Sequence, residues 1–366
     1  MTSSPLLTVD LDAITAATRR LRAQLGAGGF SLLGVTKAVD GEPAVARALL
    51  EGGAGGLADS RLQSLQRLAA ERLGPRTLIR APQRDELESA AAVADRVFLS
   101  DPEAARALGA HAPGGRGSPR KVEVLLTVDL GDRREGVLPD AAAAVAAQLT
   151  GLPGISLAGI AVNFACLSGQ LPSQALFRAA EAVLASIADD CVAEPLLSLG
   201  GTCVLQHLKG YAPRFATEIR SGGGPLYGYD FVSGKSLAGL ERVDPVLTAV
   251  VLESSRKPPA PPGSGGFDAF GHVPDADLPD TDANYALLNV GRRDCEPGGL
   301  RPLLPGARLA GATSDVSVLV TEHLLRPGDT VSFAVDYDAL VRAMTSPFVA
   351  KEFVSRTSSG IPKGDS

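Results

Sequence analysis

Residues 32–40 read LLGVTKAVD. The apolar run is typical of a buried strand, it ends at Lys37, and a turn at Asp40 and Gly41 follows before a helical segment begins. Burial disfavours the charged form of a lysine side chain and makes the neutral amine available as a nucleophile. The alternative interpretation is an ordinary lysine at a strand end whose charged group reaches solvent.

The same unit of strand, turn and helix recurs along the chain as far as Ile219. Alternating elements of this kind predict parallel strands joined by right-handed crossovers. Eight units favour a closed (β/α)8 TIM barrel over an open sheet, and no G-x-G-x-x-G motif follows the first strand. The expected strands are 31–36, 56–58, 76–80, 96–99, 121–129, 155–163, 195–199 and 215–219, and the expected helices between them are 43–51, 60–73, 84–93, 101–110, 140–149, 173–188 and 202–208.

The pattern changes after about residue 229, where short β-rich segments are separated by turns. We expect strands at 243–254, 284–290, 316–322 and 330–335. The sequence therefore predicts a barrel over residues 11–235 and a smaller C-terminal β domain over residues 236–366, and an N-terminal strand in residues 1–10 joins the β domain.

Composition excludes several classes of protein. The net charge is −6, the pI is about 5.4 and there is no basic block, which argues against nucleic acid or an anionic membrane as a partner. No apolar run is long enough to span a bilayer, and the first residues do not resemble a secretory signal. The four histidines are not at metal-ligand spacing, so we expect no metal. The four cysteines are far apart and predict reduced thiols in a cytoplasmic protein: Cys166, Cys191, Cys203 and Cys295.

The active groups of a barrel lie at the carboxyl ends of its strands. Two of the predicted ends are glycine-rich, Gly200 to Thr202 and Gly222 to Gly224, and their backbone amides suit an anion such as phosphate. A lysine and a phosphate site in one barrel mouth suggest pyridoxal 5'-phosphate (PLP) held as a Schiff base. A sugar-phosphate aldolase that uses Lys37 would combine the same features.

Seven motifs in this order resemble those of the fold-type III PLP enzymes and, among these, the alanine/ornithine racemase group. They cover nearly the whole chain: GVTKAVDG around Lys37, LADSRLQSL from Leu57, TVDLGDRREGVLP around Arg134, GIAVNFACLSGQLP around Asn163, SLGGT ending at Thr202, EIRSGGGPLYG around Arg220 and GATSDVSVL around Asp315. The resemblance implies an alanine racemase-like fold, PLP as cofactor and an amino acid as substrate. It also implies a head-to-tail homodimer in which the partner's β domain completes each site.

The resemblance also implies roles for individual residues. Lys37 would bind PLP and act as the base on one face of the substrate Cα, and Arg220 would hydrogen-bond the pyridine nitrogen. Arg134 would support the cofactor's phenolic oxygen or the substrate carboxylate. The remaining cofactor-binding positions would be Thr202 with the amides of Gly201, Gly222 and Gly223 at the phosphate, together with Asn163 and Ser198.

A racemase needs a second base on the opposite face of Cα, and here the sequence departs from alanine racemases. The expected tyrosine is absent near Phe270, and His272 is the nearest group that ionises near neutral pH. A solvated loop histidine is the alternative interpretation. Cys295 and Asp315 are further candidates. The uncertain base leaves open a lyase, a decarboxylase, an aldolase or a non-catalytic PLP-binding protein. A basic substrate side chain would need an acidic partner, for which Asp132, Asp294 and Asp315 are available.

Overall fold

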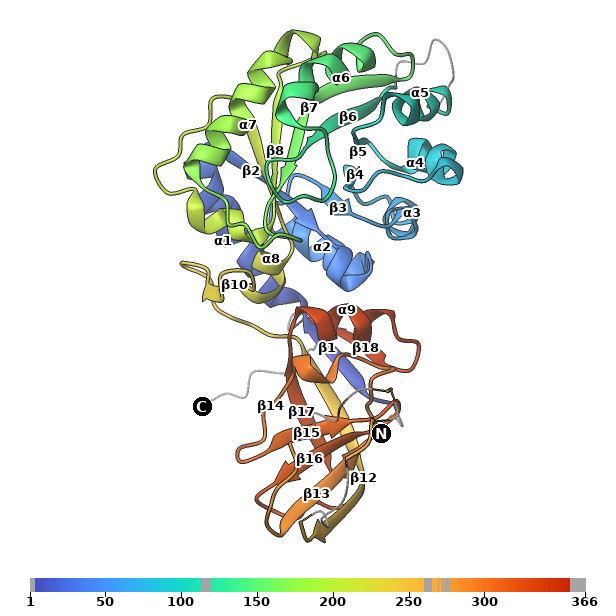
Figure 1. Ribbon diagram of the computed structural model, residues 1–366, viewed down its shortest axis with the longest axis vertical. Helices are drawn as coiled ribbons and strands as arrows, with labels where there is room; N and C mark the ends of the chain where they lie inside the picture. Colours follow the sequence, from blue (N-terminus) through green and yellow to red (C-terminus); the bar gives the residue numbers. More distant parts are fainter. Residues whose placement is uncertain are drawn as a thin grey trace, which may run out of the picture. The chain divides into compact units, whose positions relative to one another are not determined.

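The structure is a computed structural model that describes residues 4–112, 120–259, 265–268, 270–271, 273 and 277–355 (Figure 1). It contains two compact units. The barrel unit comprises residues 12–243, and the β unit comprises residues 1–11 and 244–366. The barrel unit thus extends beyond residue 235, where the sequence analysis had placed its end. The segment after the short hairpin of β10 (Tyr229–Asp230) and β11 (Lys235–Ser236) still contacts the barrel unit, since the Val243 amide donates a hydrogen bond to the Tyr227 carbonyl.

Eight parallel strands form the closed barrel, and their order around it follows the sequence from β2 to β9. The last strand pairs in parallel with the first, which closes the sheet. The strands are β2 (Phe30–Val35), β3 (Leu57–Asp59), β4 (Arg76–Leu78), β5 (Arg96–Leu99), β6 (Val122–Val128), β7 (Ile155–Asn163), β8 (Leu196–Gly200) and β9 (Ala216–Ser221). The predicted TIM barrel is confirmed.

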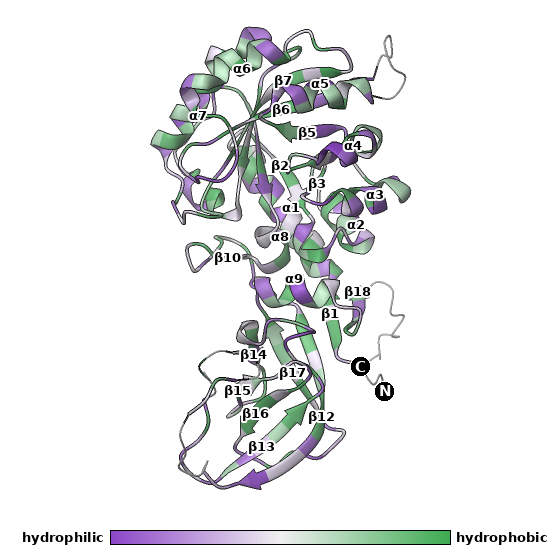
Figure 2. Cartoon of the chain, turned by 45° about the vertical axis from the view of Figure 1, so that its right-hand side comes forward, coloured by the Kyte–Doolittle hydropathy of each residue, from purple (hydrophilic) through white to green (hydrophobic). Residues whose placement is uncertain are grey.

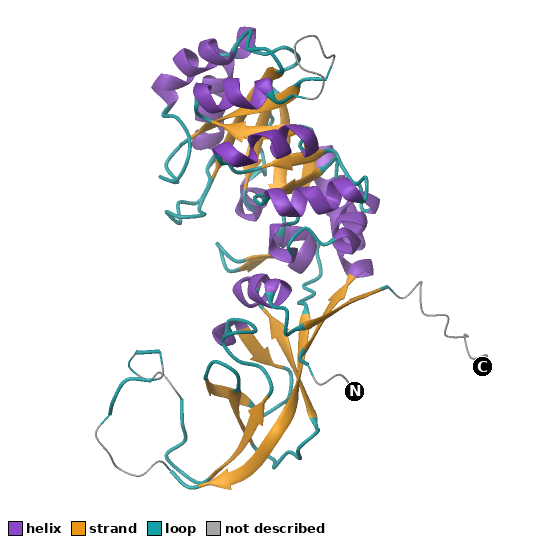
Figure 3. Cartoon of the chain, turned by 90° about the vertical axis from the view of Figure 1, so that its right-hand side faces the viewer, coloured by secondary structure: helices purple, strands orange, loops and turns teal. Residues whose placement is uncertain are grey.

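Helices surround these strands, as Figure 3 shows for the barrel unit. The helices are α1 (Leu11–Ala27), α2 (Pro43–Glu51), α3 (Leu62–Ala70), α4 (Leu87–Val93), α5 (Pro102–Ala110), α6 (Ala142–Leu149) and α7 (Gln174–Ser186). In α3 the apolar side chains of Leu62, Leu65 and Leu68 are buried at helical spacing. Figure 2 shows that the helices around the barrel contain both hydrophobic and hydrophilic residues. Each helix therefore covers the barrel with one face.

The end of the barrel differs from the sequence prediction. The expected helix 202–208 is a 3-10 helix, η5 (Thr202–His207), and only a five-residue helix, α8 (Gly223–Tyr227), follows β9. The residues before these two helices, Gly201 and Gly222, have no side chain that could cap the first turn. Each glycine-rich segment thus leads from the end of a strand into the first turn of a short helix at the mouth of the barrel.

Apolar side chains fill the barrel interior below the mouth. Phe98, Leu125 and Ala161 form one buried cluster, and Leu33, Val35 and Ala58 form another. Their contacts join strands from different parts of the chain, so burial of apolar surface fixes the relative heights of the strands. The polar side chains at the mouth are therefore held on a packed base.

The β unit contains a twisted sheet in the order β14-β17-β12-β13-β16-β15. Strand β1 (Leu6–Asp10) also belongs to it, because β1 pairs with β12 and with β18. The other strands are β12 (Val246–Lys257), β13 (Ala283–Leu288), β14 (Leu300–Pro302), β15 (Arg308–Ala312), β16 (Ser317–Thr321), β17 (Thr330–Val335) and β18 (Ala350–Val354).

The sequence analysis did not predict α9 (Tyr337–Thr345) or strands β14, β15 and β18 of this unit. The Asp336 side chain caps α9 by accepting a hydrogen bond of 3.0 Å from the Ala339 amide, and four of the helix's residues are buried. A bilayer-spanning helix, which would need greater length and apolar character, does not occur in the described parts of the chain.

Candidate active site

A pocket of about 310 Å³ opens at the carboxyl ends of the barrel strands. All its lining residues come from the barrel unit, so its shape does not depend on the β unit. Four of the residues expected at the site line it, namely Lys37, Arg134, Asn163 and Arg220. The other lining residues are Ser60, Ile79, Arg80, Phe98, Thr127, Glu135, Ala161 and Val162.

Lys37 is the first residue of the 3-10 helix η1 (Lys37–Val39), directly after β2. The preceding residue, Thr36, is fully buried and donates a hydrogen bond of 2.7 Å to Asp59. Asp59 also accepts a hydrogen bond from the Arg61 amide, and burial raises the pKa of this carboxyl group. The two strand ends thereby fix the backbone that carries the lysine. The Lys37 side chain itself is exposed, which agrees with the alternative of a lysine whose charged group reaches solvent and contradicts a buried amine. Strand β2 ends at Val35, and Thr36 is the last buried residue before the lysine.

Asn163, Gly200 and Arg220 lie side by side on three neighbouring strands, β7, β8 and β9. A side chain at the middle position would prevent this arrangement. A Cβ atom on Gly200 would lie 1.9 Å from Nη2 of Arg220 and 2.8 Å from Oδ1 of Asn163. Glycine is therefore required at this position to leave room for the guanidinium group.

The Arg220 guanidinium is buried and held from three sides. Nη1 donates a hydrogen bond of 2.8 Å to the Ser198 hydroxyl, and Nη2 donates one of 2.9 Å to the Val162 carbonyl. The guanidinium carbon lies 4.9 Å from the ring centre of Phe98. Burial lowers the pKa of Arg220 to about 10. The group is thus a cation of fixed orientation that faces the pocket from its floor.

Asp132 holds Asn163 in place. Its carboxylate accepts hydrogen bonds from Asn163 Nδ2 at 3.0 Å and from the amides of Leu167 and Ser168 at 2.9 and 3.3 Å. Burial alone would raise the pKa of Asp132, but these hydrogen bonds and the nearby Arg134 lower it. Because the carboxylate is buried and already paired, Asp132 is the least suitable of the acidic residues considered for a basic substrate side chain if such a residue must be accessible.

The lowered pKa of Asp132 predicts a pH-dependent contribution to stability. A carboxyl group whose pKa is lowered on folding stabilises the protein above its unfolded pKa of 3.8, and this contribution is lost as the pH falls through the folded pKa. We expect Asp132→Asn to lower the free energy of unfolding by about 1 kcal/mol near neutral pH, because charge-assisted hydrogen bonds are lost. Urea unfolding should show a smaller difference from the wild type below pH 3.8. The exposed Asp140 provides the control variant Asp140→Asn, and an equal effect of the two substitutions would contradict the prediction.

Arg134 lies in the loop after β6, with its side chain 37% exposed. It forms an ion pair with the adjacent Glu135, which also lines the pocket, and its Nε lies 3.8 Å from Asp132. Burial opposes the charge of Arg134, but the hydrogen bond and the attraction of Glu135 raise its pKa. The side chain remains charged at the rim, where it can contact a ligand.

The two glycine-rich loops meet at one place. The Thr202 hydroxyl lies 3.1 Å from the Ser221 hydroxyl, and a Cβ atom on Gly223 would approach Thr202 Oγ1 to 3.1 Å. A Cβ atom on Gly222 would approach the carbonyl oxygen of Val35 to 2.9 Å, which places this loop against the strand that leads to Lys37. A side chain on Gly223 would therefore enter the space beside Thr202, whereas one on Gly222 would meet the Val35 backbone. Gly223 begins a helix, so its amide has no acceptor within that helix.

Three other residues considered in the sequence analysis do not line the pocket. Ser198 is fully buried beneath Arg220 rather than in the pocket lining. Asp315 belongs to the β unit, where it pairs with Arg293 at 3.3 Å. Burial raises the pKa of the Cys295 thiol to about 12, which makes it a poor base. His272 lies outside the described residues.

Sequence reasoning missed Arg80, which follows β4 and lines the pocket. Arg80 pairs with Glu86 at 2.9 Å, while its Nε atom is buried without a hydrogen-bond partner. The signal was present in the sequence, because Arg80 is the last residue of the expected strand 76–80, and the ends of barrel strands carry the active groups. Glu135 was missed for another reason, since only the folded loop brings it to the pocket.

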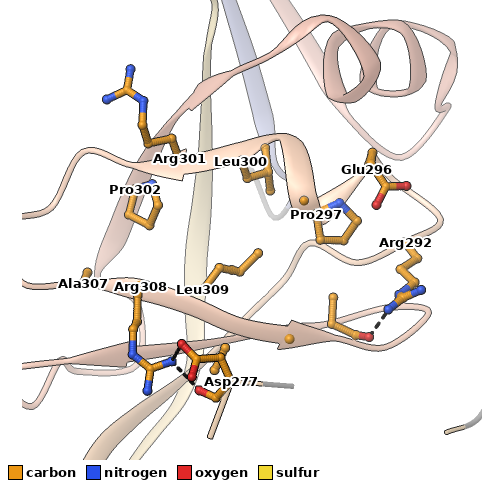
Figure 4. Close-up of a pocket in the computed structure, with 14 residues that line it drawn as sticks. Asp277, Arg292, Glu296, Pro297, Leu300, Arg301, Pro302, Ala307, Arg308 and Leu309 are labelled. Carbon is orange, nitrogen blue, oxygen red and sulfur yellow. Dashed lines mark hydrogen bonds and ion pairs between the residues drawn. The ribbon is translucent and has the colours of Figure 1, made fainter. Parts of the chain in front are cut away.

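A second pocket, of about 440 Å³, lies within the β unit (Figure 4). Two arginines of its lining form ion pairs, Arg308 with Asp277 and Arg301 with Asp244 at 3.0 Å. All its lining residues belong to the β unit. We assign the candidate active site to the pocket at the carboxyl ends of the barrel strands, because it contains Lys37 and Arg220.

A closed (β/α)8 barrel with a lysine after its first strand, accompanied by an antiparallel β unit, defines a protein with the alanine racemase-like fold. The sequence profile of the alanine racemase N-terminal domain matches residues 9–230, and the chain belongs to this family.

Individual relatives agree with this assignment. The chain is 30% identical over 359 residues to lysine racemase from Thermotoga maritima, covering 95% of this chain and 98% of the relative. It is 27% identical over 365 residues to ornithine racemase from Acetoanaerobium sticklandii, covering 96% and 99%. The crystal structure of alanine racemase from Bacillus anthracis with bound L-Ala-P has a TM-score of 0.74 and 17% identity, with 97% of this chain and 96% of that chain covered. The relatives support an enzyme of the amino acid racemase class.

Proposed function

We propose that the protein is a PLP-dependent amino acid racemase whose active site is the barrel pocket. The observation that carries the proposal is the presence of Lys37 and Arg220 in one pocket, with both glycine-rich loops at the same end of the barrel. Family membership and the two racemase relatives support it.

The residues present fit the cofactor. The amine of Lys37 suits the aldehyde of PLP, and the buried guanidinium of Arg220 can donate a hydrogen bond to an unprotonated ring nitrogen. Thr202 with the amides of Gly201, Gly222 and Gly223 would hold the phosphate, because the missing side chain of Gly223 leaves space beside the Thr202 hydroxyl. When bound, PLP supplies a conjugated ring that accepts the electrons left on Cα after proton removal.

The chain's own residues would then bind the substrate and move its proton. The Lys37 amine, exposed at the mouth, takes the Cα proton on one face. Arg134 binds the substrate carboxylate or the phenolic oxygen of the cofactor, and Asn163, fixed by Asp132, limits the space beside it.

Racemisation also needs a second base on the opposite face of Cα. We propose that the β domain of a partner subunit in a head-to-tail homodimer supplies it, with His272 and Asp315 as the candidates. Support comes from the pocket itself, whose lining belongs entirely to the barrel unit and includes neither Asp315 nor Cys295. The names of the two relatives make lysine and ornithine the first substrates to test, with alanine as the third.

The test is incubation of the purified protein with PLP in deuterated water and each L-amino acid in turn. We expect an absorbance band of the bound cofactor, deuterium at Cα and formation of the D-enantiomer for at least one substrate. Deuterium exchange without inversion would contradict the racemase and indicate a single working base. Failure to bind PLP would overturn the proposal as a whole.

A further inference from the structure

A chain of polar side chains runs through the barrel interior from Arg220 toward the amino ends of the strands. Arg220 donates to the Ser198 hydroxyl at 2.8 Å, and Ser198 donates to Glu218 at 2.5 Å. The other oxygen of Glu218 accepts a hydrogen bond of 3.0 Å from Arg96. Arg96 also pairs with Glu123 at 2.9 Å. Positive and negative side chains thus alternate along this hydrogen-bonded series from Arg220 to Glu123.

Strand register explains why these residues meet. Glu218 and Arg220 are two positions apart on β9, so both side chains point to the same face of the strand. Ser198 is the register partner of Glu218 on the neighbouring strand β8. Glu218 is only 6% exposed, whereas the Glu123 side chain at the outer end is 47% exposed. A buried carboxylate in a barrel core is unfavourable without partners, so its presence calls for an explanation.

The direction of the hydrogen bonds links Glu218 to Arg220. A carboxylate can only accept, so the single proton of the Ser198 hydroxyl points to Glu218. The lone pairs of Ser198 are then turned toward Arg220, which can only donate. The carboxylate therefore determines the orientation of the hydroxyl, and the hydroxyl determines the position of the guanidinium.

We infer that Glu218, acting through Ser198, is a positioning residue that holds Arg220 as an oriented cation for the cofactor ring. The inference rests on the proposed function, because it assigns Arg220 to the PLP nitrogen. Glu218 does not line the pocket and touches neither cofactor nor substrate in this scheme. It provides the negative charge that a fully buried guanidinium needs to remain charged.

The electrostatic surroundings of Arg220 support this role. Burial lowers the pKa of Arg220 to about 10, and among the neighbouring charges Glu218 is the strongest influence in the opposite direction. The other ionisable groups that act on Arg220 are Cys166 and Glu135, which raise its pKa, and Arg134, which lowers it. Removal of the Glu218 charge should therefore make Arg220 lose its proton at a lower pH.

The experiment measures the affinity of the apoprotein for PLP by absorbance titration across a range of pH. We expect Glu218→Gln and Ser198→Ala to weaken binding by about 10-fold to 100-fold, the effect typical of losing the outer partner of a ligating group. The affinity for PLP should fall at high pH, where Arg220 loses its proton. In Glu218→Gln this fall should begin at a lower pH than in the wild type. Glu123→Gln is the matched control. It also removes a carboxylate that pairs with Arg96, but this carboxylate lies at the exposed end of the hydrogen-bonded series, away from Arg220.

The inference would be overturned if Glu218→Gln bound PLP with wild-type affinity and if its affinity began to fall at the same high pH as that of the wild type. If that variant does not fold, Ser198→Ala decides the question, because it removes only the connecting hydroxyl. Absence of PLP binding by the wild type would contradict the proposed function instead. The inference would then be judged by a crystal structure of Ser198→Ala, where an unmoved Arg220 guanidinium overturns it and a displaced one supports it.

Discussion

Substitution of Lys37 by alanine should lower the racemisation rate on the order of 10⁴-fold, because it removes the group assigned to both cofactor attachment and proton transfer. The fold should be unaffected. The Lys37 side chain is exposed, and the backbone around it is fixed by Thr36 and Asp59 rather than by the lysine. The free energy of unfolding should therefore change by no more than about 0.5 kcal/mol.

The measurement combines the rate of D-enantiomer formation, the cofactor absorbance band and urea unfolding of the same preparations. Lys209→Ala is a matched control, because Lys209 is an exposed lysine of the barrel unit that does not line the pocket. The control should retain wild-type values in all three measurements. A Lys37→Ala variant with undiminished racemisation would contradict the assignment of this pocket as the active site.

Substitution of Arg220 by methionine should affect both catalysis and stability. The change removes a buried cation while leaving the Glu218 carboxylate in the core, and breaking such a buried arrangement typically lowers the free energy of unfolding by about 3 kcal/mol. Racemisation should fall at least about 100-fold, since one preorganised hydrogen-bond donor to the reacting system is lost.

Denaturant unfolding with and without PLP separates the two effects. Arg47→Met serves as the control, because Arg47 pairs with Glu71 on the surface with 45% of its side chain exposed. We expect the control to change stability by less than about 1 kcal/mol. If Arg220→Met proved no less stable than Arg47→Met, Arg220 would not be a buried charge on which the core depends.

Several features of the fold were predicted correctly because they depend on local periodicity. Alternation of apolar strands and amphipathic helices up to Ile219 is sufficient to specify parallel strands, and the number of units favours a closed barrel. The β unit was predicted less completely. Strands β14, β15 and β18 are short or irregular, and α9 lies among strands, so neither period dominates a long enough window.

The candidate site was predicted in part for the same reason. Lys37, Asn163 and Arg220 stand at or near strand ends, and parallel strands bring their ends to one side of a barrel. The same rule about strand ends also predicts Arg80 as a site residue. It does not predict the burial of Asp132, because the partners Leu167 and Ser168 come from a loop whose path the sequence does not reveal.

The sequence by itself determined the order of the strands, the end of the barrel that carries the polar groups, and the positions of Lys37 and the glycine-rich loops along the chain. Only the tertiary structure decided which side chains are buried and which of them meet. Glu218 lies 20 residues from Ser198 and 122 from Arg96, yet contacts both. Such contacts depend on strand register and barrel closure, which arise from the packing of the whole interior and leave no local periodic signal.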